Sequence, residues 1–223
     1  GYFQASLERY TELEDDYYKA RVIHLIGHCR LCLSGIQDFV PYAQESMRMT
    51  RRIGDKANEA IFLMGLVLAD FFLEGPNTAE RHVEAGYAAA NEVGYGLALA
   101  QANNFAGIFQ MLRGSLDQAA EYLDTGLAVA REINFFVPIL YALAAQGVLH
   151  SLIGRPEEGL KYIRESSAYR GDPYITQFAA WASAVTYASN NDYANASRQI
   201  ERVVSRDRQH SVCLLYTSPS PRD

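Results

Sequence analysis

The sequence predicts an all-α fold, a right-handed α-solenoid of antiparallel helix pairs, on two observations. Small residues recur with a step of 40 positions, at Ser6, Ser46, Gly86, Gly126 and Ser166. Branched apolar residues recur with the same step, at Leu13, Ile53, Val93 and Ile133. A fixed period is the signature of stacked supersecondary units, and a small residue held in register lets two helices cross closely. We therefore expect small residues to line a seam between neighbouring helix pairs.

The elements follow from a plan that each unit repeats, which is an apolar helix, a tight turn and a second, amphipathic helix. A single helix is expected over residues 3–13. The predicted pairs are 17–33 with 37–53, 56–73 with 77–93, 96–113 with 117–133, 136–153 with 157–169, and 174–189 with 193–207. A residue that tolerates the left-handed conformation marks the turn within each pair. These residues are Gly35, Gly75, Gly114, Gly154 and Asn191.

The second helices end at a repeated stop, in which Gly54, Gly94 or Asn134 follows the last apolar residue. The prolines agree with these boundaries, because a proline is tolerated in a first helical turn, where its missing N–H has no partner to lose. We expect all five prolines before residue 207 in a first turn or its approach, and none inside a helix. They are Pro41, Pro76, Pro138, Pro156 and Pro173.

Small residues also recur within each pair. Gly107, Gly114, Ala119 and Gly126 lie at relative positions 0, 7, 12 and 19, and the next unit repeats these offsets. The fifth unit keeps the pattern after a shift of three positions. We predict that the following small residues pack the helices together: Ser6, Ser46, Gly86, Gly126, Ser166, Gly107, Gly147, Ala184, Ala119, Gly159 and Ala196.

This pattern resembles the tetratricopeptide repeat over nearly all of residues 1–207, although the period is 40 instead of about 34. Arg131 also stands where that family usually has a closing proline. Segments 126–133 and 154–160 are similar to the long-period arrays of bacterial signalling regulators. Those regulators join an ATPase module to a class III nucleotide cyclase or to a LuxR/MalT-type DNA-binding domain.

We expect residues 1–207 to form one tetratricopeptide-like repeat domain and residues 208–223 to lie outside the repeats. Residues 213–223 resemble the translation of a transposase adapter used in sequencing libraries, so we interpret them as an artefact and exclude them from the fold. The sequence begins without Met, and we expect the repeat domain to be cut from a longer chain at both ends.

Composition argues against nucleic acid and membrane as partners. The net charge is -6, whereas a phosphate backbone calls for clustered cations. The tight basic cluster Arg48, Arg51 and Arg52 is interpreted as the solvated end of a helix rather than as a phosphate site. No apolar run reaches the ~18 residues of a membrane span. Three cysteines in a composition of this kind favour a reducing setting, so we expect a cytoplasmic protein.

One cluster of metal-ligating residue types occurs in the first pair. His24, His28 and Cys32 recur every four positions on one helix face, and Cys29 and Cys32 form a C-x-x-C. A zinc site needs four ligands and no second such pair follows in the repeats. We therefore favour small core cysteines, expect no metal or cofactor, and keep a metal or redox protein as a remote alternative.

No catalytic signature such as a phosphate loop or a zinc-protease motif is present, so we expect a non-enzyme. The acidic residues Glu12, Glu14, Asp15 and Asp16 are interpreted as a solvated connection, and His150 as a structural histidine.

The resemblance implies that first helices face a concave groove in which a partner segment binds. Asn103 and Asn104 lie in a first helix, where amides suit a peptide backbone, and Tyr141 offers an amphipathic ring. We hypothesise a non-enzymatic interaction and regulatory module of a larger signalling protein, whose partner is a protein, a peptide or an adjoining domain of the same chain. The alternative is a small-ligand-sensing repeat domain of an ATPase-linked transcriptional regulator or nucleotide cyclase.

Overall fold

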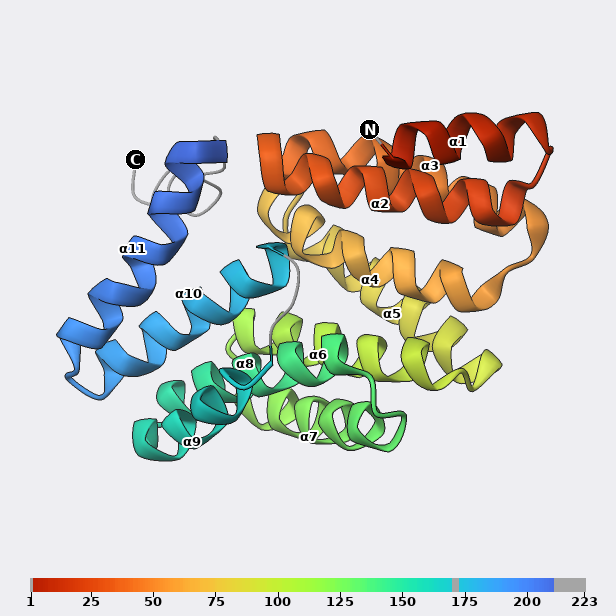
Figure 1. Ribbon diagram of the computed structural model, residues 1–223. Helices are drawn as coiled ribbons and strands as arrows, with labels where there is room; N and C mark the ends of the chain where they lie inside the picture. Colours follow the sequence, from red (N-terminus) through yellow and green to blue (C-terminus); the bar gives the residue numbers. More distant parts are fainter. Residues whose placement is uncertain (1, 170–172, 211–223) are drawn as a thin grey trace.

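The computed structural model describes residues 2–169 and 173–210, which form eleven helices, in the predicted order, and no strand (Figure 1). Their bounds are α1 Tyr2–Glu12, α2 Asp16–Ser34, α3 Ile36–Ile53, α4 Lys56–Leu73, α5 Pro76–Val93, α6 Gly96–Leu112, α7 Leu116–Glu132, α8 Phe136–Leu152, α9 Pro156–Ser166, α10 Pro173–Ser189 and α11 Tyr193–His210. The largest differences from prediction are that α9 ends three residues early and α11 runs three residues further. The proposed adapter sequence, 213–223, lies outside the described residues.

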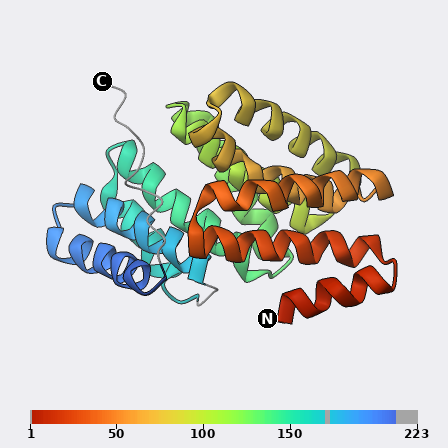
Figure 2. The ribbon, with the colours of Figure 1, turned by 90° about the horizontal axis from the view of Figure 1, so that it is seen from above.

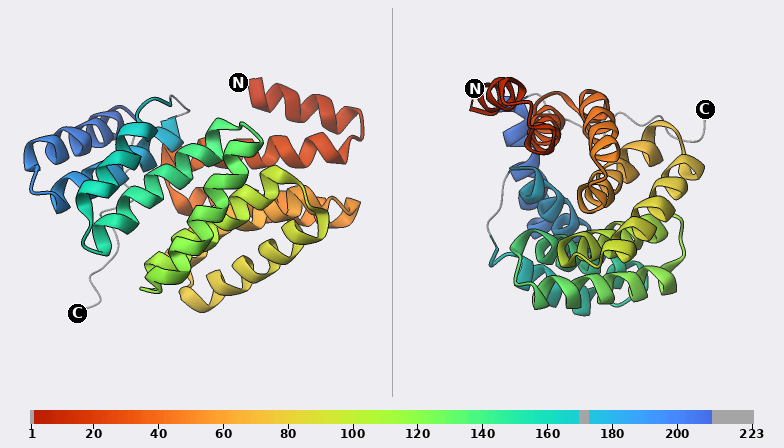
Figure 3. Two further views of the ribbon diagram at one scale, coloured as in Figure 1. Left: turned by 90° about the horizontal axis from the view of Figure 1, so that it is seen from below. Right: turned by 90° about the vertical axis from the view of Figure 1, so that its right-hand side faces the viewer.

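The helices pack as antiparallel pairs, which are α2–α3, α4–α5, α6–α7, α8–α9 and α10–α11. Successive pairs stack side by side, and the array bends until α10 and α11 both contact α2 (Figure 2). Seen along the axis of the bend, the helices form a ring (Figure 3). The predicted α-solenoid of helix pairs is therefore observed. It curves so strongly that the last pair, α10–α11, contacts the first pair at α2.

The repeated stops adopt the predicted left-handed conformation, with φ of 75° at Gly54, 66° at Gly94 and 50° at Asn134. At Gly54, the N–H of Asp55 donates to the carbonyl of Thr50 at 2.9 Å, which closes the helix in a Schellman-type cap. The same bond recurs at Asn134, where Phe135 N donates to Ala130 O at 3.2 Å. The ends of α3, α5 and α7 are thus encoded locally.

Pro41 departs from the predicted placement of prolines. Because α3 begins at Ile36, Pro41 lies inside the helix and past its first turn. Its ring nitrogen cannot donate to the carbonyl of Gln37, one turn earlier, and this removes one backbone hydrogen bond. The expectation that no proline interrupts a helix is wrong at this position, whereas Pro76 and Pro156 begin their helices as expected.

Glycines allow the two helices of a pair to cross closely. A Cβ added to Gly86 of α5 would lie 2.2 Å from Met64 Cε of α4. One added to Gly126 of α7 would lie 2.2 Å from Asn104 Oδ1 and 3.1 Å from the backbone nitrogen of the same residue in α6. The small residues that recur every 40 positions therefore lie mainly between the two helices of one pair. The prediction that they lie between neighbouring pairs is wrong for Gly86 and Gly126.

First-helix glycines meet large side chains of the second helix. A Cβ on Gly107 would lie 2.6 Å from Leu123 Cγ, and one on Gly147 would lie 2.5 Å from Ile163 Cδ1. Gly159 approaches the backbone of α8 and also Thr186 of α10, so the fourth pair uses its glycines both internally and against the next pair.

The remaining small residues of the predicted set divide into buried and half-exposed ones. Ser46, Ser166, Ala119, Ala184 and Ala196 are buried. Ser6 is only partly buried, and α1 has no buried residue, because α1 lies at the end of the array and packs mainly on α2. A close-packing role for Ser6 is therefore wrong.

The apolar column Leu13, Ile53, Val93 and Ile133 lies at the edge of the array, where the pairs are connected, and its side chains are 37% to 56% exposed. Ile133 covers the start of α6, since a Cβ on Gly96 would lie 2.6 Å from Ile133 Cγ2. This column forms the rim of the junctions between pairs and does not belong to the core.

Gly126→Leu should lower the free energy of unfolding by about 1–3 kcal/mol through overpacking, because its Cβ collides with Asn104, including the backbone. Ala128→Leu is the matched control, since Ala128 is exposed on the same helix. Urea unfolding of both variants measures the difference. Equal midpoints for the two variants would contradict the proposed helix crossing.

Candidate functional site

The residues predicted to line a groove are buried. Asn103 is 4% exposed, Asn104 1% and Tyr141 6%. The Tyr141 ring lies 5.5 Å from that of Phe105 and 5.2 Å from that of Phe178. The prediction that these residues face a partner is wrong, because closure of the array packs the side chains of its inner helices against one another.

The two asparagines have structural partners instead. Asn104 Nδ2 donates to the carbonyl of Pro138 at 2.8 Å and so ties α6 to the start of α8. Asn103 Nδ2 donates to Leu99 O of its own helix at 2.8 Å. Asn104 thus links the third pair to the fourth.

An accessible cleft of about 680 Å³ lies between α2, α4 and the connection from α5 to α6. The backbone of α4 lies close to that of α6, α6 lies close to α8, and α8 lies close to α10. The backbones of α2 and α4 do not approach each other in this way. Side chains fill only part of the space left at this first junction. The lining residues are Tyr17, Arg21, His24, Leu25, Asp55, Ala57, Asn58, Ile61, Phe62, Val93, Tyr95 and Leu97.

The walls of the cleft are aromatic and aliphatic. Tyr95 is 51% exposed, and Leu25 and Val93 are 44% and 42% exposed. Phe62 and His24 lie buried at its floor. Exposed apolar side chains gathered around a concavity are typical of binding surfaces.

Arg21 supplies the positive charge of this cleft. Its Nη1 donates to the Tyr17 hydroxyl at 3.0 Å, and its guanidinium lies 5.6 Å from the centre of the Tyr17 ring. Among the described residues, no carboxylate lies within ion-pair distance of Arg21. An anionic group of a ligand would find here an arginine that pairs with no described carboxylate.

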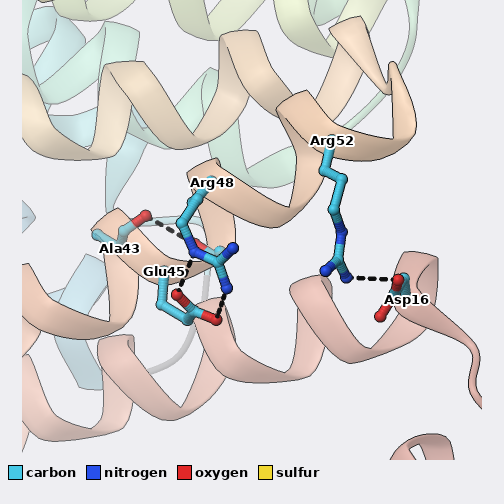
Figure 4. A network of polar contacts seen from close by, with 6 residues as sticks. Asp16, Ala43, Glu45, Arg48 and Arg52 are labelled. Carbon is cyan, nitrogen blue, oxygen red and sulfur yellow. Dashed lines mark hydrogen bonds and ion pairs between the residues drawn. The ribbon is translucent and has the colours of Figure 1, made fainter.

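The basic cluster predicted to be a solvated helix end is neutralised by carboxylates. Arg48 contacts Glu45 through two nitrogens, at 2.8 and 2.6 Å, and Arg52 Nη2 contacts Asp16 at 2.5 Å (Figure 4). Arg51 Nε donates to Glu59 at 2.7 Å. These pairs make a phosphate site at this position unfavourable, in agreement with the prediction.

The His24 ring joins α2 to its neighbours. Its Nε2 lies 2.9 Å from Nε2 of His28, and its ring stacks on Phe62 with centroids 4.0 Å apart. Its Nδ1 lies 3.5 Å from Ser46 Oγ. Burial, and then the neighbouring His28, lower the pKa of His24 well below its usual value.

Cys29 does not follow the prediction of a small core cysteine. Cys29 is exposed on α2 and does not belong to the core. The side chain of Cys32 lies outside the described set. The described residues contain no group of three or more histidines, cysteines or carboxylates placed to hold a metal ion.

Asp15 and Asp16 of the acidic connection have structural partners, and so does His150, which was interpreted as a structural histidine. Asp15 accepts from the N–H of Tyr18 at 3.1 Å and so caps α2, while Asp16 pairs with Arg52. The His150 ring stacks on Tyr162 at 5.1 Å, and its Nδ1 lies 3.2 Å from Glu158. None of these groups lines the cleft described above, although the acidic connection borders an open hollow of about 710 Å³ that adjoins the cleft at Tyr17 and Asp55.

Comparison with known proteins identifies the architecture alone. No family model matches the chain, and no curated protein matches it. Among solved structures it is similar to the crystal structure of BtubC (BKLC) from P. vanneervenii, with a TM-score of 0.61 and 13% identity, over 99% of this chain and 92% of that one. At this identity the likeness shows a shared fold of stacked helices. No described helix is long and apolar enough to cross a membrane.

The cleft residues were not apparent from the sequence. Two signals could have pointed to them: Tyr95 directly follows the Gly94 stop, as Phe135 follows Asn134, and Tyr17 and Arg21 are four positions apart on one helix. Residues after such a stop lie at the exposed junctions between pairs, where a ring can remain accessible.

Glu59 links α3 to α4 beside this junction. It is buried, and it accepts from Arg51 Nε at 2.7 Å and from Lys56 Nζ at 2.9 Å. Burial alone would raise the pKa of its carboxyl, but the two hydrogen bonds outweigh burial and lower that pKa below its usual value near 4.5.

Glu59→Gln should therefore lower the free energy of unfolding at pH 7 by about 1–2 kcal/mol, a value reduced for the solvent exposure of its partners. The stabilisation is present above pH 4.5 and is lost as the pH falls through the lowered pKa, so wild type and variant should converge in acid. Urea titrations at about pH 7 and about pH 3.5 measure this. Glu45→Gln, in a more exposed pair, is the control and should stay within about 0.5 kcal/mol; a constant Glu59→Gln effect at both pH values would contradict the assignment.

Proposed function

We propose that the chain is a non-enzymatic interaction and regulatory module of a larger cytoplasmic signalling protein, and that it binds a segment of a protein partner in the cleft between α2, α4 and Tyr95. The observation that carries this proposal is the combination of exposed aromatic and aliphatic walls with Arg21, which lacks a carboxylate partner among the described residues.

The chemistry of the cleft favours a segment that presents an acidic group beside apolar side chains. The carboxylate would meet the Arg21 guanidinium, which suits planar bidentate recognition. The apolar side chains would lie between Leu25 on one wall and Val93 and Tyr95 on the other. Aromatic and arginine side chains of this kind carry much of the energy of protein interfaces.

The polar groups of the cleft support binding rather than acid–base chemistry. Asp55 accepts from the backbone nitrogen of Asn58 at 3.1 Å and from its side chain at 2.5 Å, so its carboxylate is committed to capping α4. His24 is held by His28 and Phe62 at the floor. The resemblance to long-period arrays of ATPase-linked regulators supports a place in a signalling protein.

A second candidate, a small-ligand sensor in such a regulator, is favoured by the position of the cleft. Its volume lies within the usual range for small-molecule sites of about 300–1,000 Å³, and it spans the junction of the first two pairs. A ligand there would contact both pairs and could alter the angle between them.

Selection from a displayed peptide library with the full chain tests the proposal. We expect enrichment of segments with Asp or Glu beside apolar residues. Arg21→Ala and Tyr95→Ala should each weaken a selected peptide by about tenfold, which corresponds to about 1.4 kcal/mol. Arg9→Ala is the control, because Arg9 is an exposed arginine of α1 outside the cleft. Selected peptides that bind Arg21→Ala and Tyr95→Ala as tightly as the wild type would refute the site. Thermal stabilisation of the chain by aromatic carboxylic acids that is lost in Arg21→Ala would favour the small-ligand sensor.

A further inference from the structure

His24 is one of the side chains through which α2 contacts α4. The backbones of these helices remain apart, while the His24 ring stacks on Phe62 of α4 at an interplanar angle of 20°. A Cβ on Gly65 of α4 would lie 3.3 Å from Cε1 of the same ring. The first pair therefore meets the second partly through one buried imidazole.

The hydrogen bonds around His24 fit a neutral ring. The Ser46 hydroxyl donates to the carbonyl of Ala43 at 2.9 Å, so its oxygen is left to accept from Nδ1–H of His24. That tautomer leaves a lone pair on Nε2, which accepts from Nε2–H of His28 at 2.9 Å. The hydrogen-bond pattern thus assigns the proton of His24 to Nδ1. A second proton on His24 would meet the hydrogen that His28 donates.

We propose that His24 is an acid-sensitive latch: the neutral ring holds α2 against α4, and protonation of His24 releases α2 and widens the cleft. The inference does not depend on the proposed function, because it concerns the free chain.

The surroundings of His24 offer little to stabilise a cation. On α2 the facing groups are Arg21, which is itself positive, and His28. The groups from α3 are the neutral Ser46 and Phe39, and those from α4 are the neutral Phe62 and Asn58. Asp55 is the one carboxylate among the residues that line the cleft, and it is committed to the cap of α4. A buried charge without a partner is costly, so release into water is the favoured response.

The direction of the pH dependence follows from linkage. When α2 is released, His24 lies in water and titrates near about pH 6.5; in the closed array its pKa lies lower. The latch is therefore fully effective above about pH 6.5. Below it, the equilibrium constant for opening rises by up to about tenfold per pH unit, until the pH reaches the pKa of the closed state.

Hydrogen exchange of the full chain at about pH 7.5 and about pH 5.5, corrected for intrinsic rates, tests the latch. We expect exchange in α2 and the first half of α4 to increase about tenfold at the lower pH relative to α6 and α7. His24→Phe keeps an aromatic ring on Phe62 and should abolish this increase. His150→Gln, which removes a histidine far from the first junction, should leave it intact.

A second measurement keeps the test decisive if His24→Phe does not fold. The ring Cε1 proton of His24, followed by NMR in the wild-type chain, should titrate together with the change in α2 exchange. Exchange in α2 that does not depend on pH, an increase that persists in folded His24→Phe, or a His24 titration near about pH 6.5 with α2 still protected would each overturn the proposal.

Discussion

The structure depends on the close crossing of the two helices within each pair, which requires that a large side chain of one helix meets a small residue of the other. Met64 meets Gly86, and Asn104 meets Gly126, at equivalent places of successive units. His24 and Ser46 occupy the same two columns in the first pair, in contact through a hydrogen bond. Protein interiors are packed as densely as crystals, so each crossing limits the combined volume of the two side chains that face each other, and not their identity. Polar side chains can therefore occupy these positions.

The polar side chains at these positions make the contacts of one unit differ from those of the next. Asn104 uses its amide to bind Pro138 O, and so fixes α6 to α8. His24, at the corresponding place of the first pair, stacks on Phe62 of α4 and supplies the floor of the cleft. A repeat that carries Met64 in this column offers only an apolar contact. Candidate function therefore arises where the packing column carries a group with hydrogen-bonding and acid–base chemistry, at the junction that the array packs least closely.

The sequence was sufficient for features that depend on local chemistry. The 40-residue period, the left-handed stops at Gly54, Gly94 and Asn134, and the order of the helices follow from residue types at fixed spacing. It was insufficient where distant elements decide exposure. Asn103, Asn104 and Tyr141 would be accessible in an open array, but the return of α10 and α11 to α2 buries the inner face. The prediction of a buried Cys29 is wrong for a related reason. Its place in a helix does not tell which face of α2 the other helices leave exposed.

The unequal junctions also indicate where the molecule can respond. The helices α4, α6, α8 and α10 pack in an unbroken row, and their shared core includes Met64, Phe105, Phe109 and Tyr141. Separating any two of them would expose this apolar surface at a cost of about 25 cal/mol per Å². The first junction combines the α3–α4 contact with His24, Phe62 and the salt bridge at Glu59, so it contains groups whose strength changes with charge. A ligand or proton that acts at this junction should therefore change the contact of α2 with α4, while the row of α6, α8 and α10 stays packed.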